Sequence, residues 1–191
     1  MKQYRQILRP DKNEYPSYSQ HYFDLIKTDS DILQELNDNF FKLKELIYSL
    51  SSDRLLYRYA KNKWTIKETL VHNIDDERIF SYRALRYARN DDTPLLSFEQ
   101  DNYVSYAYAN DRSLESIFDE YEAVRNATLT LFQNLPEDAL MRRGGGIDTD
   151  GNVYNIRTVR ALAYHITGHE LNHIKIIKER YLDMALEKYV F

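Results

Sequence analysis

The chain has 191 residues, within the length of one domain, and its formal net charge of −4 excludes the broad basic surface that sequence-independent binding of nucleic acid requires. It contains no cysteine, which excludes disulfides, thiolate zinc sites and a thiol nucleophile of its own. Any transition metal would therefore be bound by imidazole and carboxylate groups.

Residues 1–28 show no helical period and contain two prolines and several aromatic side chains, Tyr22 among them. We expect an irregular arm that packs on the body of a single domain, residues 1–191, through its rings. The first ten residues lack the apolar core of a signal peptide, and no later run approaches a membrane span. The sequence thus predicts a cytoplasmic protein with no membrane partner.

Apolar residues recur at steps of three and four from Ser30 to Leu50, which predicts a first long helix. The segment Thr65–Glu68 has the form of a capping box, so a second helix should begin at Ile66 and continue through Arg89. Residues 91–112 form a long connection, with a short helix expected around residues 98–108, and connections of this length are often functional.

A third helix is expected after Ser113, up to the Leu135-Pro136 pair. The run of three glycines after Arg143 and the turn residues 150–152 indicate a loop or a small hairpin. A fourth helix, capped by Thr158, should run from Val159 to about Leu186. With no convincing set of strands, the pattern predicts an all-α four-helix bundle.

The last helix carries histidines at positions 165, 169 and 173. Residues four apart lie on one helix face, so neighbouring pairs can share an ion, but the outer two lie about 12 Å apart along the axis and cannot. The apolar stripe of the helix includes His169 and His173, whereas His165 lies to one side, as a pocket wall, a supporting residue or plain structure. Two buried imidazoles need partners. Hydrogen bonds to a carbonyl or a tyrosine would suffice, and a metal would satisfy both.

A third ligand must come from elsewhere, and His72 on the second helix is favoured over His21 in the arm, although His72 lies off the centre of its helix's apolar stripe. Glu77 lies on that stripe, while Asp75 and Asp76 are closer to His72 by helical spacing. Any of the three could orient a ligand imidazole, and the two aspartates are equally compatible with a solvated surface.

Residues 169–173 also match the H-E-x-x-H pattern of zinc proteases, in which the glutamate is the general base. No downstream G-x-x-H follows, and no strands that would hold an extended substrate are apparent. A protease is therefore a minor alternative.

Several segments of the chain resemble segments of the DinB/YfiT-like superfamily and occur in the same order along the sequence. They are Trp64–Glu68, His72–Arg78, Tyr82–Arg86, Phe98–Asp101, Asn110–Leu114, Gly168–His173 and Ile177–Leu182. The resemblance implies a bundle with up-down-down-up connections and one divalent metal ion held by His72, His169 and His173. The chain departs from many relatives at Asn73 and Asn172, neither of which is an implied ligand.

Three imidazoles leave a metal with an open position, as in catalytic sites. From the resemblance we expect an enzyme that uses Zn²⁺, Ni²⁺, Mn²⁺ or Fe²⁺ to transfer a low-molecular-weight thiol to a small electrophile. The alternatives are a metal-dependent hydrolase and a non-catalytic metal- or small-molecule-binding stress protein. The chain could form a homodimer. We expect the pocket beside the metal to include Tyr22, Glu77, Arg83, Asp101, Tyr103 and His165.

Overall fold

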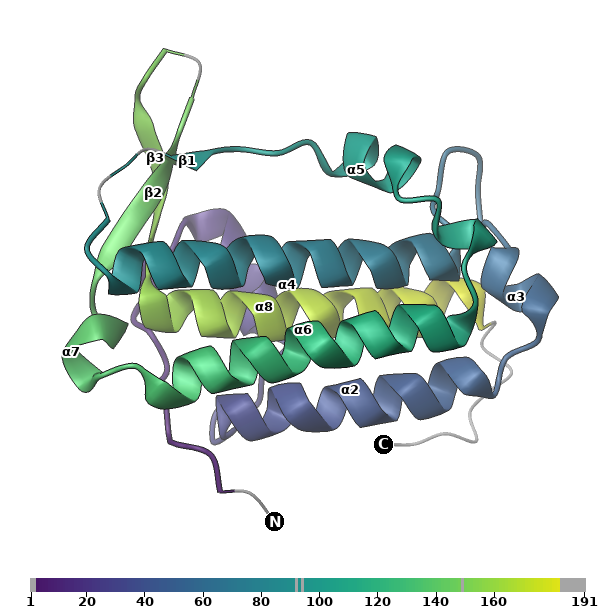
Figure 1. The fold of residues 1–191 in the computed structure, drawn as a ribbon, viewed down its shortest axis with the longest axis horizontal. Coiled ribbons are helices and arrows are strands. Elements are labelled where there is room, and N and C mark those ends of the chain that lie inside the picture. Colours follow the sequence, from purple (N-terminus) through teal and green to yellow (C-terminus); the bar gives the residue numbers. More distant parts are fainter. Residues whose placement is uncertain (1–2, 92, 94, 149, 183–191) are drawn as a thin grey trace.

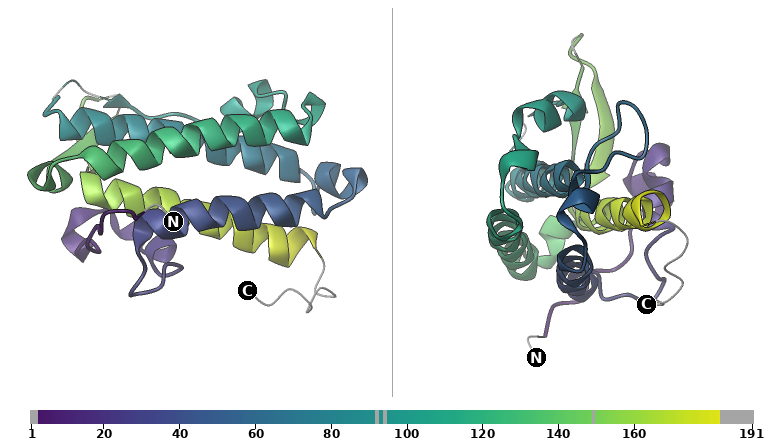
Figure 2. Two further views of the ribbon diagram at one scale, coloured as in Figure 1. Left: turned by 60° about the horizontal axis from the view of Figure 1, so that its bottom comes forward. Right: turned by 90° about the vertical axis from the view of Figure 1, so that its right-hand side faces the viewer.

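The computed structural model describes residues 3–91, 93, 95–148 and 150–182. Four long helices pack side by side in Figure 1, and the end-on view of Figure 2 shows them as a bundle. They are α2 (Ile32–Tyr48), α4 (Ile66–Ala88), α6 (Leu114–Asn134) and α8 (Val159–Ile176). In Figure 1, α2 and α8 run in one direction and α4 and α6 in the other. The predicted four-helix bundle with up-down-down-up connections is thus confirmed.

Each long helix begins where the sequence offers an N-cap. The hydroxyl of Thr65 accepts from the Glu68 amide at 3.1 Å, and the Glu68 carboxylate accepts from the Thr65 amide at 2.7 Å, which completes the predicted capping box. Ser113 caps α6 and Thr158 caps α8 in the same way. These bonds satisfy amides that have no partner within the helix, so the predicted starts at residues 66 and 159 are confirmed.

Because α4 and α6 are parallel, the chain must return along the whole bundle between them. Figure 1 shows residues 95–113 crossing back over α4. The crossing contains the short strand β1 (Leu95–Leu96), the helix α5 (Gln100–Tyr106), which confirms the predicted short helix, and the 3-10 turn η3 (Ala109–Asp111). This segment covers a face of α4 that would otherwise be exposed.

The glycine-rich segment forms a hairpin of β2 (Arg143–Ile147) and β3 (Val153–Thr158), and β1 adds to it in parallel to give a three-stranded sheet in the order β1-β2-β3. The hairpin projects from one end of the bundle in Figure 1. The hairpin confirms one of the two predicted alternatives for this segment. The sequence predicted no strand set, so the three-stranded sheet that β1 completes is the main difference in fold. Strand β1 has two residues and β2 three consecutive glycines, so neither shows the alternating pattern that identifies a strand.

The N-terminal arm contains the 3-10 turns η1 (Lys12–Glu14) and η2 (Ser17–Ser19) and the short helix α1 (Gln20–Phe23), beside α8 in Figure 2. As expected, it packs through its rings: Tyr15 and Phe23 are buried and stack with centroids 3.9 Å apart, and Phe23 stacks on Tyr164 of α8. A Cβ on Gly168 would lie 2.5 Å from the carbonyl oxygen of Tyr22. Glycine at position 168 therefore lets the backbone of the arm approach α8.

The remaining short helices are α3 (Ser52–Leu56) and α7 (Glu137–Leu140). After Ile176 the last helix continues as a π-helical turn, η4 (Ile177–Tyr181), and the predicted end near Leu186 lies outside the described residues. Among the described residues, no helix combines the length and the apolar character needed to cross a membrane.

A charged cluster lies in the core among three of the long helices. Arg125 of α6 is 2% exposed, and its guanidinium pairs with Glu77 of α4 at 2.9 Å and Glu170 of α8 at 2.6 Å. It also donates to the Leu36 carbonyl, and Tyr121 donates to Glu170 at 2.6 Å. Such a buried arginine needs hydrogen-bonded counter-charges, and the cluster supplies them.

Candidate metal centre

Three imidazoles from two helices meet inside the bundle. His72 of α4 and His169 of α8 are buried, and His173, one turn further along α8, is half-buried. The Nε2 atom of His169 lies 3.2 Å from the Nε2 atoms of both His72 and His173. Ligand atoms of the three side chains all lie within 4.8 Å of one another, the arrangement that the sequence analysis expected.

These distances fit a shared cation. Two nitrogens bound to one tetrahedral ion at about 2.0–2.1 Å lie about 3.3–3.4 Å apart, close to the two contacts of 3.2 Å. Protein hydrogen bonds alone serve the cluster poorly. If the Nδ1 atom of His169 carries a proton, its Nε2 has one lone pair and cannot accept from both His72 and His173. A cation satisfies all three nitrogens at once.

The imidazoles are held neutral, as metal ligands must be. Burial lowers the pKa of His72 to about 4 and that of His173 to about 3. Burial also lowers the pKa of His169 far below its usual value, and the neighbouring imidazoles lower it further. At neutral pH each ring therefore has a lone pair available.

Asp76 orients the central imidazole. One of its carboxyl oxygens lies 3.3 Å from the Nδ1 of His169, and burial raises the pKa of Asp76 to about 8. When the Nδ1 of His169 carries a proton, the lone pair of its Nε2 points at the other two imidazoles. A cation bound by the three Nε2 atoms would favour this tautomer, with the Asp76 carboxylate as the acceptor of the Nδ1 proton. Of the three acidic residues that the sequence offered for this role, the structure places Asp76 against a histidine.

The position of His72 follows from the burial of α4. The projection of the apolar stripe put this residue off centre, yet it is 2% exposed, and its neighbour Asn73 is 3% exposed. Helix α4 packs on α6 and α8, while the crossing segment covers a further face. A helix with several covered faces has no single apolar stripe, so the projection was misleading here.

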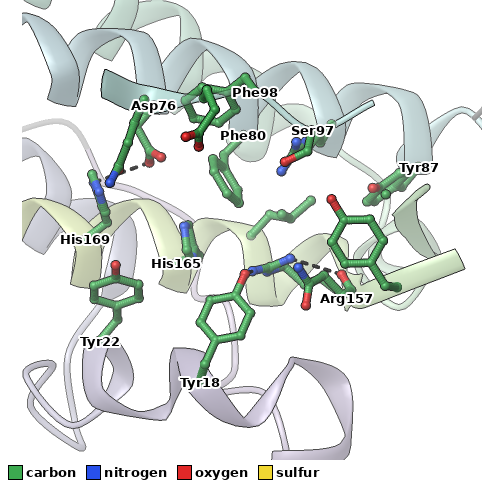
Figure 3. Close-up of a pocket in the computed structure, with 17 residues that line it drawn as sticks. Tyr18, Tyr22, Asp76, Phe80, Tyr87, Ser97, Phe98, Arg157, His165 and His169 are labelled. Atoms are coloured by element: carbon green, nitrogen blue, oxygen red, sulfur yellow. Dashed lines mark hydrogen bonds and ion pairs between the residues drawn. The ribbon is translucent and has the colours of Figure 1, made fainter. Parts of the chain in front are cut away.

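A cavity lies next to His169, the one candidate ligand that lines it, and three of the expected pocket residues line it as well: Tyr22, Arg83 and His165. The rings of Tyr22 and His165 meet edge to face with centroids 5.2 Å apart, and His165 stacks on Phe80 at 4.0 Å. In Figure 3 the hydroxyl of Tyr22 points toward the histidines. Burial raises the pKa of Tyr22 to about 12, so the phenol stays protonated.

The other expected pocket residues do not line this cavity. Asp101 lines a second cavity, which includes the candidate ligand His173 and Trp64, so it also lies beside the imidazoles. Tyr103 is 48% exposed on α5. Glu77 does not join the metal centre, because its carboxylate pairs with Arg125. His21, which received no ligand role, is exposed.

The protease interpretation fails on the direction of Glu170. In the H-E-x-x-H arrangement this carboxylate must face the metal to act as a base. Here it accepts hydrogen bonds from Tyr121 and Arg125 in the core. Glu170 therefore has a structural role in this bundle.

Several residues at the site were not predicted from the sequence. Trp64 packs against His72, with ring centroids 4.6 Å apart, and Arg157 and Tyr18 are among the unpredicted residues that line the cavity. Arg157 directly precedes the cap of α8, and this was the one available signal. This position predicts a cavity residue only once the hairpin is known, because the hairpin directs the Arg157 side chain inward.

Comparison with known proteins gives concordant results. The sequence pattern described as the DinB superfamily matches residues 36–177. A protein of Oceanobacillus iheyensis named "Putative metal-dependent hydrolase OB0413" is 27% identical over 145 residues, which cover 75% of this chain and 82% of that protein. The fold is similar to that of YfiT from Bacillus subtilis, with a TM-score of 0.62 and 15% identity over 90% of this chain and 92% of the other. That structure is described as a probable metal-dependent hydrolase with an unusual four-helix bundle topology.

Proposed function

The chain belongs to the DinB superfamily, and we propose that it binds one divalent metal ion through His72, His169 and His173 and hydrolyses a small-molecule substrate in the adjoining cavity. The convergence of three neutral imidazole nitrogens within 4.8 Å carries this proposal. A structural zinc site has four protein ligands, whereas three leave room for water or substrate. An ion held in this way lowers the pKa of a bound water molecule and polarises a substrate carbonyl.

The protein's own residues would complete the chemistry. Asp76 holds His169 in the tautomer that ligation requires. Tyr22, whose phenol stays protonated, can donate a hydrogen bond to an oxygen that gains negative charge in the transition state. Rings of Phe80 and Tyr22 line the cavity and exclude water from its apolar walls.

Hydrolysis is preferred to thiol transfer. The relative from Oceanobacillus iheyensis and the structural neighbour are both described as metal-dependent hydrolases, one putative and one probable. A small substrate is favoured because the cavity measures about 200 Å³, which is below the usual range for ligand sites.

Metal content tests the first part of the proposal. Protein purified without a histidine tag should contain one equivalent of a divalent metal by mass spectrometry, and His169→Ala should contain almost none. His21→Ala is the matched control, because His21 is exposed and lies outside the cluster. Equal metal content in both variants would contradict the assignment of the ligands.

Activity assays test the second part. We expect cleavage of small esters or amides without any thiol, abolished by a chelator and restored by the metal that the protein carries. Conjugation of a low-molecular-weight thiol to an electrophile, in the absence of hydrolysis, would instead support transfer. Metal binding with neither activity would leave a binding protein.

A further inference from the structure

The cavity beside His169 is elongated, with a different chemical character at each end. Figure 3 shows His169 and Asp76 at one end, Phe80 and His165 in the middle, and Arg157 at the other. A molecule that fills the cavity therefore has one end near His169 and the other near a guanidinium group.

Arg157 is buried, and none of the carboxylates that the structure describes pairs with it. It is 4% exposed, and its guanidinium donates to the carbonyl of Asn155 at 3.0 Å and to the hydroxyls of Tyr18 and Ser19. Its Nε atom is buried with no acceptor. Arg125, by contrast, is 2% exposed and pairs with two glutamates. A buried cation whose partners are all neutral needs a counter-charge, which a ligand can supply.

A second arginine lies on the same side of the cavity. The guanidinium carbon of Arg83 lies 4.8 Å from the centroid of the Phe80 ring, and that of Arg157 lies 5.5 Å from the same centroid. Burial lowers the pKa of Arg83, and the charge of Arg157 contributes to the decrease. Among the described residues, Arg83 has no ion pair within 4.0 Å. Two cations thus flank one ring.

The acidic residues of the cavity balance this pair only in part. Asp76 lies against the Nδ1 of His169, and its charge also acts on both arginines, although among the described residues it forms no ion pair with either within 4.0 Å. Glu99, which also lines the cavity, is exposed to solvent. His165 lies between the two ends and is buried, with an unpaired Nδ1 that offers a further polar contact. The buried end of the cavity therefore has excess positive charge before any metal binds.

We propose that the substrate of this site carries an oxyanion group, a carboxylate or a phosphate, which Arg157 and Arg83 bind while the bond to be cleaved lies near His169. The inference rests on the proposed function. Guanidinium groups match the geometry of both oxyanions, and they act most strongly in a site shielded from water. The volume of about 200 Å³ and the rings of Tyr22, Phe80 and Phe98 fit a body as small as one planar ring.

Binding of simple probes tests this assignment without turnover. Benzoate and phenylphosphonate supply the two oxyanions on one ring, and benzamide is the neutral analogue of benzoate. Each is titrated into ¹⁵N-labelled protein, first with the metal removed by a chelator and then with one equivalent of Zn²⁺. Metal content and circular dichroism are recorded for every variant.

We expect at least one of the two anions to bind the metal-free protein about tenfold or more tightly than benzamide. Arg83→Gln and Arg157→Gln should each lower that affinity about tenfold or more. Two exposed arginines provide matched controls: Arg89→Gln at the end of α4 and Arg143→Gln in β2 should leave it unchanged. If the buried Arg157 variant does not fold, the half-buried Arg83 decides the test.

Two results would overturn the inference. Benzamide could bind as tightly as the anions, which would show that the rings alone drive binding. Alternatively, the anions could bind only to the zinc-loaded protein, with no effect of Arg83→Gln, which would make them ligands of the metal. Both results leave the metal site intact. A wild-type protein that binds the anions but no metal would refute the proposed function and leave the oxyanion site standing.

Discussion

The substitution Gly168→Ala tests whether glycine at this position is needed for the close approach of the arm, at the expense of the helix stability of α8. In an ordinary helix interior, replacing glycine with alanine raises the free energy of unfolding by about 1 kcal/mol, because alanine is the better helix former. Here the new Cβ would lie 2.5 Å from the Tyr22 carbonyl oxygen and 2.8 Å from its carbonyl carbon, whereas relaxed contacts of this kind need about 3.3–3.6 Å. The arm must therefore retreat by roughly 1 Å, and overpacking of this kind costs about 1–3 kcal/mol.

The net effect should be a loss of up to about 2 kcal/mol in the free energy of unfolding, measured by urea denaturation. Trypsin should cut faster at Lys12 and Lys27 of the loosened arm, and benzoate should bind more weakly because Tyr22 has moved. Metal content should stay the same, since the added methyl group does not touch the three ligands.

Gly151→Ala is the control for this experiment. Gly151 has a φ of +82° and no atom within 4 Å of a Cβ placed there, so alanine costs about 1–2 kcal/mol through its backbone alone and should leave benzoate binding unchanged. A Gly168→Ala protein more stable than wild type by about 1 kcal/mol, with an equally protected arm, would refute the packing argument.

Three further predictions concern the charged groups. Asp76→Asn should weaken metal binding about 10–100-fold by removing the charged acceptor on His169, and unchanged affinity in competition with a chromogenic chelator would exclude that role. Arg125→Met should cost about 3–5 kcal/mol at neutral pH, because it leaves two buried glutamates without a counter-charge, and a loss below about 1 kcal/mol in urea denaturation would contradict this. Burial opposes ionisation of Glu14, but hydrogen bonds from Arg160, the Asp11 backbone and Thr158 outweigh it and lower the pKa of Glu14 to about 2. Ionised Glu14 therefore stabilises the fold at pH values above the pKa of about 4.3 that glutamate has in the unfolded chain. The difference in the free energy of unfolding between wild type and Glu14→Gln should shrink as the pH falls from about 4 to 2. A difference that stays constant over this range would be inconsistent with the prediction.

The sequence predicted the helices well because their signals are local. The capping box at Thr65 and the cap at Thr158 act within one turn, and the apolar period of each helix extends over several turns. The pair His169 and His173 followed from helical spacing together with the apolar stripe of the last helix. His72 could not be placed by projection, because the burial of α4 depends on the crossing segment, whose path is a property of the whole fold.

The cavity was the least predictable part, for the same reason. Besides α4 and α8, its walls come from the arm, the crossing segment and the hairpin, which are far apart in sequence and have no common period. Glu77 looked like a pocket residue because it is a carboxylate on an apolar stripe. The partner that accounts for it, Arg125, is on another helix and 48 positions away.

The candidate metal ligands thus lie on rigid helices, whereas the far end of the cavity is formed by irregular parts of the chain. Metal ligation needs side chains fixed within a fraction of an ångström, and the packed helices α4 and α8 provide that. The far end of the cavity is formed by Tyr18 of the arm and Arg157 of the hairpin, segments whose sequence can change without disturbing the packing of four helices. Proteins of this fold could accordingly keep the imidazoles and change the substrate through these segments alone. Gly168 limits that freedom at Tyr22, whose backbone approaches α8 where the helix lacks a side chain.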